Sequence, residues 1–375
     1  MKIVCDNKIP FLKGALEPYA EVVYLPGAET TPEVVRDADA IITRTRTICN
    51  EALLKGSSVK VIATATIGFD HIDTRWCEAN GIHWENSPGC NSWSVKQYIA
   101  SVLVTLAKKH GFRFDEMTLG VVGVGNVGSK VADVARLMGF KVLLNDPPRA
   151  RREGNGNFVS LEQLTAESDI ITVHVPLTHE GEDATFHLFD GPRLDGLRKD
   201  QILINSSRGE VVDNKELKRI LLNKSIKGAV LDVWEGEPQL DPQLVSLLDI
   251  TTPHIAGYSA DGKANGTTMS VQTVARQLDL PLKQWKATGV PAPDRPLSFV
   301  IDAEGLSMQE VLSRAILYTY DVLDDSDALR CRLGDFEKLR GDYPVRREFT
   351  AFSLTLEHGT EEMAERLRAI GFTVK

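Results

Sequence analysis

Four polar residues in the middle of the chain each follow a short apolar stretch that predicts a buried strand. Arg208 follows "ILINSS", Asp232 follows "GAVL", Glu237 lies in "WEGEP", and His254 follows "TTP". Taken singly, each has an ordinary structural explanation, such as a surface ion pair, a turn former or a buried histidine. At the carboxyl ends of parallel strands, however, they would lie where open α/β sheets bind ligands.

These side chains together suit the oxidation of a hydroxy acid to a keto acid, which removes a hydride from carbon and a proton from oxygen. An imidazole such as that of His254 can accept the proton near neutral pH. Glu237 would hold the ring in the right tautomer, and Arg208 would clamp the substrate carboxylate with its planar fork. A nicotinamide would take the hydride.

The stretch "LGVVGVGNVGSKVADVARLMGF" provides a place for such a cofactor. Gly123, Gly125 and Gly128 form GxGxxG between a predicted strand and a predicted helix, the context of a dinucleotide-binding loop. Asp146 follows the next predicted strand, roughly 20 residues beyond the loop, where a carboxylate binds the ribose of NAD and repels the 2′-phosphate of NADP. Three arginines close behind weaken that preference: Arg149, Arg151 and Arg152. A glycine turn without a ligand is the alternative.

Alternating strand-like and helical stretches must position these residues. Four clear strand patterns precede residue 90, with a weaker fifth at "GIHW", and six more run from 118 to 252. This alternation predicts parallel sheets covered by helices on both faces. A helix over about 94–110 should join the two sets, because cations fill its last turn and a glycine follows it.

A third region follows "VPAPDRP" (290–296), whose prolines and charges predict a linker. Beyond it, the strand-like "LSFVID", the helical "SMQEVLSRAILYTYDVL", the strand-like "EFTAFSLTLE" and "TEEMAERLRAIGFTV" predict a small α/β unit. It contains no catalytic pattern, so we expect an oligomerisation or regulatory role.

Composition narrows the possible partners and compartments. A chain of 375 residues predicts two or three domains. The net charge of −9 argues against a nucleic-acid or anionic-membrane surface, but not against a small anionic substrate. The cysteines lack metal-ligand or CxxC spacing, so we expect no metal and reduced thiols in the cytoplasm. We also expect no signal peptide and no membrane span.

Six ordered motifs resemble those of the D-isomer-specific 2-hydroxyacid dehydrogenases: "TIGFDHID", "GVVGVGNVG", "DIITVHVPLT", "INSSRGEVVD", "LDVWEGEP" and "TPHIAG". The resemblance implies a flavodoxin-like substrate domain and a Rossmann NAD domain, both doubly wound, with Arg208, Glu237 and His254 as the catalytic set. The cofactor contacts that it implies are Gly123, Gly125, Asn126, Val127, Gly128, Asp146, Val175, Pro176, Ser206, Ser207, Arg208, Asp232 and Gly257.

Two departures from the family pattern accompany this resemblance. Val175 stands where some relatives have a threonine or similar residue, so only its backbone could serve the cofactor. Lys96 and Gln97 replace an Ala-Glu pair at the start of the linking helix, and the sequence does not determine their partners.

The tail pieces "YDVLDDSDALR" and "FEKLRGDYPVRRE" are similar to one branch of that family, whose C-terminal domain forms a homodimer. This resemblance implies 4-phospho-D-erythronate as the substrate, oxidised to (3R)-3-hydroxy-2-oxo-4-phosphobutanoate in vitamin B6 biosynthesis. It divides the chain into a substrate domain (1–92 plus about 258–283), an NAD domain (93–257) and a small α/β dimerisation domain (284–375).

A phosphorylated hydroxy acid needs positive or N–H-rich contacts at both of its ends. The substrate contacts expected are Arg44, Thr45, Thr66, Gly68 and Tyr258. Arg44 and Arg46 could share one face of their strand, so either could contact the phosphate.

Two alternative functions remain open. Another phosphorylated D-2-hydroxyacid dehydrogenase, of the 3-phosphoglycerate type, would share the motifs. A non-catalytic NAD-sensing regulator on the same scaffold could also retain the catalytic set, so turnover must separate it from an enzyme.

Overall fold

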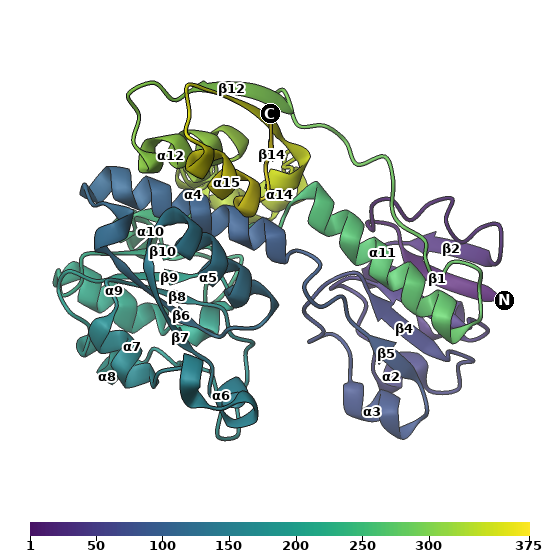
Figure 1. The fold of residues 1–375 in the computed structure, drawn as a ribbon. Coiled ribbons are helices and arrows are strands. Elements are labelled where there is room, and N and C mark those ends of the chain that lie inside the picture. Colours follow the sequence, from purple (N-terminus) through teal and green to yellow (C-terminus); the bar gives the residue numbers. More distant parts are fainter. The chain divides into compact units, whose positions relative to one another are not determined.

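The computed structural model describes residues 1–375 apart from the side chain of residue 155. Its contacts divide the chain into two compact units (Figure 1). The N-terminal unit contains Met1–Asn91 and Tyr258–Ala292, and the large unit contains Ser92–Gly257 and Pro293–Lys375. The C-terminal residues therefore group with the middle of the chain, although they form a small sheet of their own.

The N-terminal unit is built on a five-stranded parallel sheet in the order β2-β1-β3-β4-β5. This order is that of a flavodoxin-like sheet, as predicted, and the weak fifth strand is present. The strands are β1 (Lys2–Asp6), β2 (Glu21–Leu25), β3 (Ala40–Thr43), β4 (Val61–Thr64) and β5 (His83–Glu85). The helices are α1 (Pro32–Val35), α2 (Glu51–Leu54), α3 (Thr74–Ala79) and α11 (Ala260–Gln277).

Successive residues of β3 pack into two different cores because side chains of a strand alternate between its faces. Ile42 packs on one face with Val271 and Val274 of α11. Ile41 packs on the other face with Leu53 of α2. Helix α11 therefore returns from far along the sequence to complete the cover of a face on which Leu12 and Leu16 also pack.

The large unit contains a six-stranded parallel sheet in the order β11-β10-β9-β8-β6-β7. From β6 the chain goes to β7 on one side and then to β8 on the other, so the topological switch point lies at the carboxyl end of β6. The strands are β6 (Thr118–Val122), β7 (Lys141–Asn145), β8 (Ile170–Val173), β9 (Ile202–Asn205), β10 (Gly228–Leu231) and β11 (Ile250–Thr251). The helices among them are α5 (Asn126–Met138), α6 (Pro147–Glu153), α7 (Leu161–Glu167), α8 (Gly191–Asp195), α9 (Asn214–Leu222) and α10 (Pro242–Leu247).

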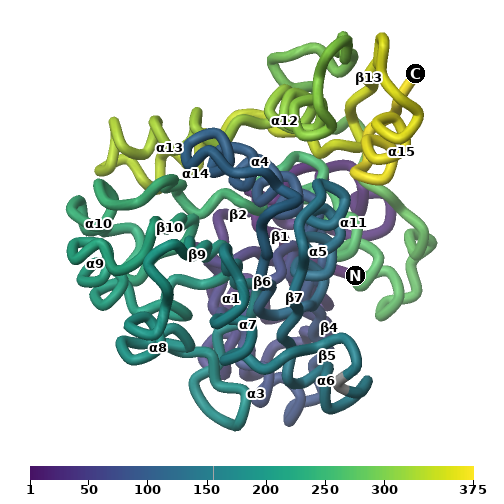
Figure 2. The backbone as a smooth tube through the Cα atoms, turned by 60° about the vertical axis from the view of Figure 1, so that its left-hand side comes forward, coloured from purple at the N-terminus to yellow at the C-terminus, as the bar shows by residue number. Residues whose placement is uncertain are grey.

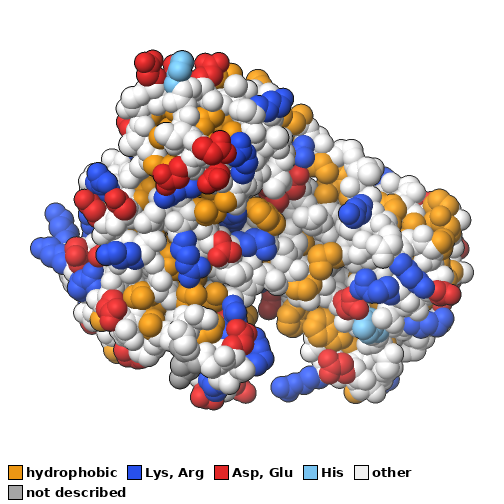
Figure 3. Space-filling model, in the orientation of Figure 1, with side chains coloured by type: hydrophobic (Ala, Val, Ile, Leu, Met, Phe, Trp, Pro, Cys, Tyr) orange, Lys and Arg blue, Asp and Glu red, His pale blue; other side chains and the backbone are white. Residues whose placement is uncertain are grey.

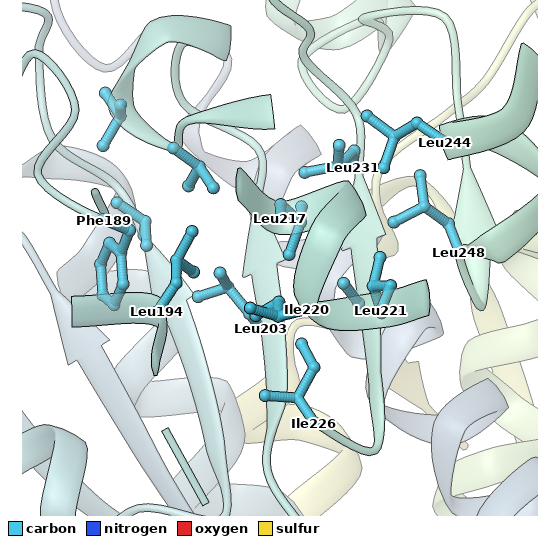
Figure 4. Close-up of a cluster of buried hydrophobic side chains, with 14 of the residues drawn as sticks. Phe189, Leu194, Leu203, Leu217, Ile220, Leu221, Ile226, Leu231, Leu244 and Leu248 are labelled. Atoms are coloured by element: carbon cyan, nitrogen blue, oxygen red, sulfur yellow. The ribbon is translucent and has the colours of Figure 1, made fainter. Parts of the chain in front are cut away.

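A leucine-rich core holds α9 on this sheet (Figure 4). Leu217, Ile220 and Leu221 follow the i, i+3, i+4 spacing that puts side chains on one helix face. They pack in one cluster with Leu203 of β9 and Leu231 of β10. This packing fixes the strands from whose carboxyl ends the polar residues extend.

The long helix α4 (Ser92–His110) lies between the Rossmann sheet's helix α5 and the C-terminal elements (Figures 1 and 2). A parallel sheet in the order β12-β13-β14 forms the centre of the C-terminal segment. Its elements are β12 (Ser298–Asp302), α12 (Met308–Thr319), α13 (Val322–Cys331), α14 (Phe336–Gly341), β13 (Ser353–Glu357), α15 (Glu361–Ile370) and β14 (Thr373–Val374). The helix expected through "YTYDVL" is two helices, because Tyr320 is extended and the Asp321 side chain caps α13.

The two residues of α4 whose partners the sequence left open bond to the C-terminal segment. Lys96 donates to the carbonyl of Ile370 at 2.8 Å, and burial lowers its pKa to about 8. Gln97 donates to the carbonyl of Arg347 at 2.9 Å and to the hydroxyl of Thr319 at 3.1 Å. The donors of this unusual pair therefore bond to the C-terminal segment, whereas the amide oxygen of Gln97 has no partner among the described residues.

Acidic and basic side chains are interspersed on the face seen in Figure 3, rather than gathered in one area. All five cysteines are free thiols. Among the described helices, none is both long and apolar enough to cross a bilayer.

Candidate active site

His254 and Glu237 form a hydrogen-bonded pair beyond the carboxyl ends of β10 and β11. Nδ1 of His254 lies 2.9 Å from Oε2 of Glu237, and Oε1 of the same carboxylate accepts the N–H of Trp234 at 2.9 Å. Both carboxylate oxygens are therefore fixed. The imidazole is about one-third exposed, with a fractional exposure of 33%. Because Nδ1 faces the carboxylate, Nε2 is the nitrogen left to exchange a proton with a ligand.

The backbone of His254 is held in an unfavourable conformation. Its φ of +56° lies in the left-handed region, which costs a non-glycine residue roughly 1–3 kcal/mol. Its N–H donates to the carbonyl of Asp232 at 2.7 Å. The Asp232 carboxylate accepts the N–H groups of Ile255 and Ala256 at 2.8 and 2.9 Å, and the Thr252 hydroxyl at 2.6 Å. Asp232 therefore shapes the turn, and its contact with the cofactor stays a prediction.

Arg208 follows β9, and its Nη1 donates to the carbonyl of Ser207 at 2.8 Å. In the part of the chain that the structure describes, no carboxylate pairs with its half-buried guanidinium. The next residue, Gly209, was not singled out from the sequence. A Cβ there would lie 2.1 Å from the carbonyl carbon of Trp234. Only glycine allows the loop that carries Arg208 to lie against the segment that carries Glu237.

The three glycines after β6 have different roles. Gly123 has a φ of +84°, and a Cβ on it would lie 2.6 Å from the carbonyl oxygen of His174. A Cβ on Gly128 would lie 1.8 Å from the carbonyl oxygen of Gly123. A Cβ on Gly125, in contrast, would meet no described atom within 4 Å. The loop therefore leaves open space before the first turn of α5, whose N–H groups suit a pyrophosphate. Two further predicted contacts lie in that turn: Asn126 and Val127.

Asp146 is fixed beside the glycine loop. Its carboxylate accepts the N–H of Val124 at 2.8 Å and the N–H of Arg149 at 3.0 Å. A carboxylate has about four acceptor sites, so two bonds leave capacity for ribose hydroxyls.

Nearby carboxylates neutralise the three arginines that had weakened the preference for NAD. Arg149 and Arg152 both pair with Glu153, at 2.7 and 2.8 Å. Arg151 pairs with Glu182 and Asp183. These pairs leave little uncompensated positive charge for a 2′-phosphate, which favours NAD over NADP.

The other predicted cofactor residues also lie at the carboxyl ends of strands in the large unit. Val175 and Pro176 follow β8, the two serines follow β9, and Gly257 follows the turn of His254. The Ser207 hydroxyl donates to Asn205 at 2.8 Å, whereas the buried hydroxyl of Ser206 has no partner among the described residues.

The predicted substrate contacts lie in the N-terminal unit, at the carboxyl ends of β3 and β4 and before α11. Arg44 is half-buried and donates to the carbonyl of Lys8 at 3.2 Å, and Thr45 is exposed. The Thr66 hydroxyl donates to the carbonyl of Gly68 at 2.9 Å. The Lys263 ammonium lies 4.8 Å from the centre of the Tyr258 ring. Their contact with a substrate stays a prediction.

Comparisons with known proteins identify the family of the chain. Residues 94–256 match the family model "D-isomer specific 2-hydroxyacid dehydrogenase, NAD binding domain", and residues 295–371 match a domain of unknown function, DUF3410. The chain is similar to the erythronate-4-phosphate dehydrogenase of Bacteroides fragilis, with 49% identity over 95% of this chain and 99% of that one. It is 42% identical to that of Porphyromonas gingivalis, over 99% of this chain and 100% of that one.

A solved structure of a D-2-hydroxy acid dehydrogenase is similar in fold. The D-lactate dehydrogenase of Aquifex aeolicus, complexed with NAD and lactic acid, matches 78% of this chain and 100% of its own length. The TM-score is 0.62 and the identity is 27%. The large unit thus contains an NAD-binding domain, and the chain belongs to the erythronate-4-phosphate dehydrogenases, within the D-isomer-specific 2-hydroxyacid dehydrogenase family.

Proposed function

We propose that this chain oxidises 4-phospho-D-erythronate to (3R)-3-hydroxy-2-oxo-4-phosphobutanoate with NAD, as a step in the biosynthesis of pyridoxal 5′-phosphate (vitamin B6). The observation that carries the proposal is the 2.9 Å pair of His254 and Glu237, which lies in the same unit as an NAD-binding loop. The substrate is taken from the name of relatives that align over nearly the whole chain.

Each side chain of the catalytic set has a separate task in this reaction. Nε2 of His254 accepts the proton of the substrate hydroxyl as the hydride leaves the adjacent carbon. Glu237 fixes the tautomer and stabilises the imidazolium that forms. Arg208 binds the substrate carboxylate and polarises the oxygen that becomes a carbonyl. Bound NAD supplies the hydride acceptor.

Residues of the N-terminal unit would select the substrate. Arg44 and Thr45 offer a cation and a hydroxyl at the end of β3 for an anionic group. Backbone N–H groups near Gly68 would bind a second anionic group, with Thr66 and Tyr258 beside them. This set fits a small acid that carries a phosphate at one end and a carboxylate at the other.

We also propose a homodimer formed through residues 284–375 and working in the cytoplasm. Strand β12 lies at one edge of the C-terminal sheet, and its Val300 is 58% exposed. Edge strands with exposed apolar side chains favour pairing with another chain. Light scattering should give a dimer mass that Val300→Lys lowers to a monomer mass, and a monomeric native protein would contradict the proposal.

A substrate panel tests the activity. Wild-type protein should reduce the keto acid with NADH and oxidise 4-phosphoerythronate with NAD, whereas 3-phosphoglycerate and NADP should react poorly. Preferred turnover of 3-phosphoglycerate would assign the other type of dehydrogenase. NAD binding without turnover of either acid would assign the non-catalytic regulator.

A further inference from the structure

Arg346 carries a buried guanidinium in the C-terminal segment of the large unit. The residue has a fractional exposure of 4%, and its guanidinium carbon lies 4.4 Å from the centre of the Tyr320 ring. Asp325 is linked to this guanidinium through the two tyrosines, because it accepts the hydroxyls of Tyr320 and Tyr343, each at 2.7 Å. A buried cation is costly unless its partners compensate it, so the groups that it binds indicate why it is there.

The main partners of Arg346 belong to the turn that follows His254. Its Nη2 donates to the carbonyl of Ala256 at 2.6 Å and to the carbonyl of Ile255 at 3.1 Å. The same nitrogen donates to the hydroxyl of Ser94 in α4, which itself donates to the carbonyl of Ala256 at 2.9 Å. The Nε of Arg346 has no acceptor among the described residues. The hydrogen bonds of this guanidinium are thus made mainly with the turn.

Two charged side chains therefore fix the backbone of the same two residues, one through their N–H groups and the other through their carbonyls. Asp232 accepts the N–H groups of Ile255 and Ala256, while Arg346 binds the carbonyls of those residues. The preceding residue, His254, has the strained left-handed backbone. Such a conformation persists only where surrounding contacts enforce it, and its direction sets where the imidazole points.

We propose that Arg346 is a positioning residue for His254. It keeps the turn in the conformation that aims Nε2 at the substrate, so the C-terminal segment completes the catalytic machinery of the large unit. The inference rests on the proposed role of His254 in hydride transfer, and it gives a task to part of the segment that matches a domain of unknown function.

The chain offers a matched control in Arg330, which lies on α13 of the same segment. Arg330 also donates to two backbone carbonyls, those of Val245 and Leu248, each at 2.8 Å. Those carbonyls belong to α10 and the residue that ends it rather than to the turn of His254. Arg330→Met should lower the unfolding temperature without changing the geometry of the imidazole.

The experiment compares Arg346→Met, Arg346→Lys and Arg330→Met with the wild type. We expect Arg346→Met to lose roughly 10²-fold in kcat, the cost of a small misplacement of a catalytic group, with KM for NAD little changed. Arg346→Lys should recover part of kcat, since it restores the charge and at least one hydrogen bond. Arg330→Met should keep kcat even if its unfolding temperature falls equally.

A second measurement needs no substrate. Hydrogen exchange of the amides of Ile255 and Ala256 should become faster in both Arg346 variants and stay unchanged in Arg330→Met. If Arg346→Met does not fold, the kcat of Arg346→Lys and its hydrogen exchange at the two amides test the proposal instead. Equal kcat in folded Arg346 and Arg330 variants, or unchanged exchange at the two amides, would overturn the proposal. If wild-type protein turns over no substrate, the proposed function fails, and exchange still tests whether Arg346 fixes the turn.

Discussion

The two large parallel sheets of this protein place polar residues at the same ends of their strands but fix them to different degrees. In the large unit, both oxygens of Glu237 are engaged, and the Asp232 carboxylate accepts three hydrogen bonds. In the N-terminal unit, Thr45 is exposed and Arg44 donates to one backbone carbonyl. The two carboxylates of the large unit are fixed in advance, whereas Arg44 and Thr45 remain available to a ligand.

This difference matches the work proposed for each sheet. A group that moves a proton must be aligned before the reaction, because reorganisation during the reaction raises the barrier. A group that recognises a charged end of a substrate can exchange solvent for the ligand when it binds, and side-chain rearrangement on binding is common. Substitutions in the two units should therefore affect different kinetic constants.

The largest effect should come from His254→Ala, which removes the proton acceptor. We expect kcat to fall by roughly 10² to 10⁴, with NAD affinity kept, in a steady-state assay that follows NADH. His83→Ala is the matched control, because His83 also pairs with a glutamate, Glu85, at 2.8 Å. A kcat for His254→Ala close to that of His83→Ala would show that His254 is not the proton acceptor.

Arg208→Lys should have the next largest effect. The substitution keeps the charge but loses the bidentate geometry, so we expect at least a roughly tenfold loss in kcat/KM. Lys218→Arg, the reverse exchange on α9, controls for a change of cation type in the same unit. An Arg208→Lys enzyme with native kcat and KM would show that the fork geometry is not used.

Arg44→Ala should act on KM instead of kcat. Loss of a charge-assisted hydrogen bond to the substrate should raise KM for the phosphorylated acid by roughly tenfold and leave kcat nearly unchanged. Arg46→Ala, measured in parallel, decides which arginine contacts the phosphate. If both variants lowered kcat to the same extent that Arg208→Lys does, the N-terminal unit would take part in the chemical step as directly as the large unit.

The smallest effect on turnover is expected for Lys96→Met, which should change the stability and its pH dependence rather than kcat. Burial lowers the pKa of Lys96 from its ordinary value of 10.5 to about 8 in the folded protein. Between these values the unfolded chain holds a proton that the folded chain has released, so the contribution of Lys96 to stability rises with pH. Below pH 8 Lys96 is charged in both states, and the burial of its charge lowers the free energy of unfolding by a constant amount.

Urea unfolding from pH 7 to roughly pH 10 measures this contribution as the difference between the wild type and Lys96→Met. The wild type should gain stability relative to the variant as pH rises. Tyrosines and thiols that unfolding exposes to water also titrate in this range, but they are common to both proteins and cancel in the difference. A constant difference across the range would contradict the lowered pKa.

Local patterns in the sequence were sufficient to predict the parallel sheets and the pair of Glu237 and His254 at the edge of one of them. Alternating strands and helices predict parallel sheets, and residues such as Glu237 and His254 then meet because strand ends share one edge. The partners of Gln97 and Arg346 were not predictable in this way. Both depend on packing between segments about 250 and 90 residues apart in sequence, which no local pattern encodes. Gly209 is an intermediate case, because the sequence shows a glycine there but does not show that it lies against the backbone of Trp234.

The return of α11 to the N-terminal sheet also sets an order of events during synthesis. Val271 and Val274 complete a core that begins with Ile3 and Ile42, so part of one face of the first sheet stays uncovered while the ribosome makes the whole six-stranded sheet. The sheet that is translated first is thus completed after the six-stranded sheet. Until then the apolar residues that α11 will cover favour aggregation.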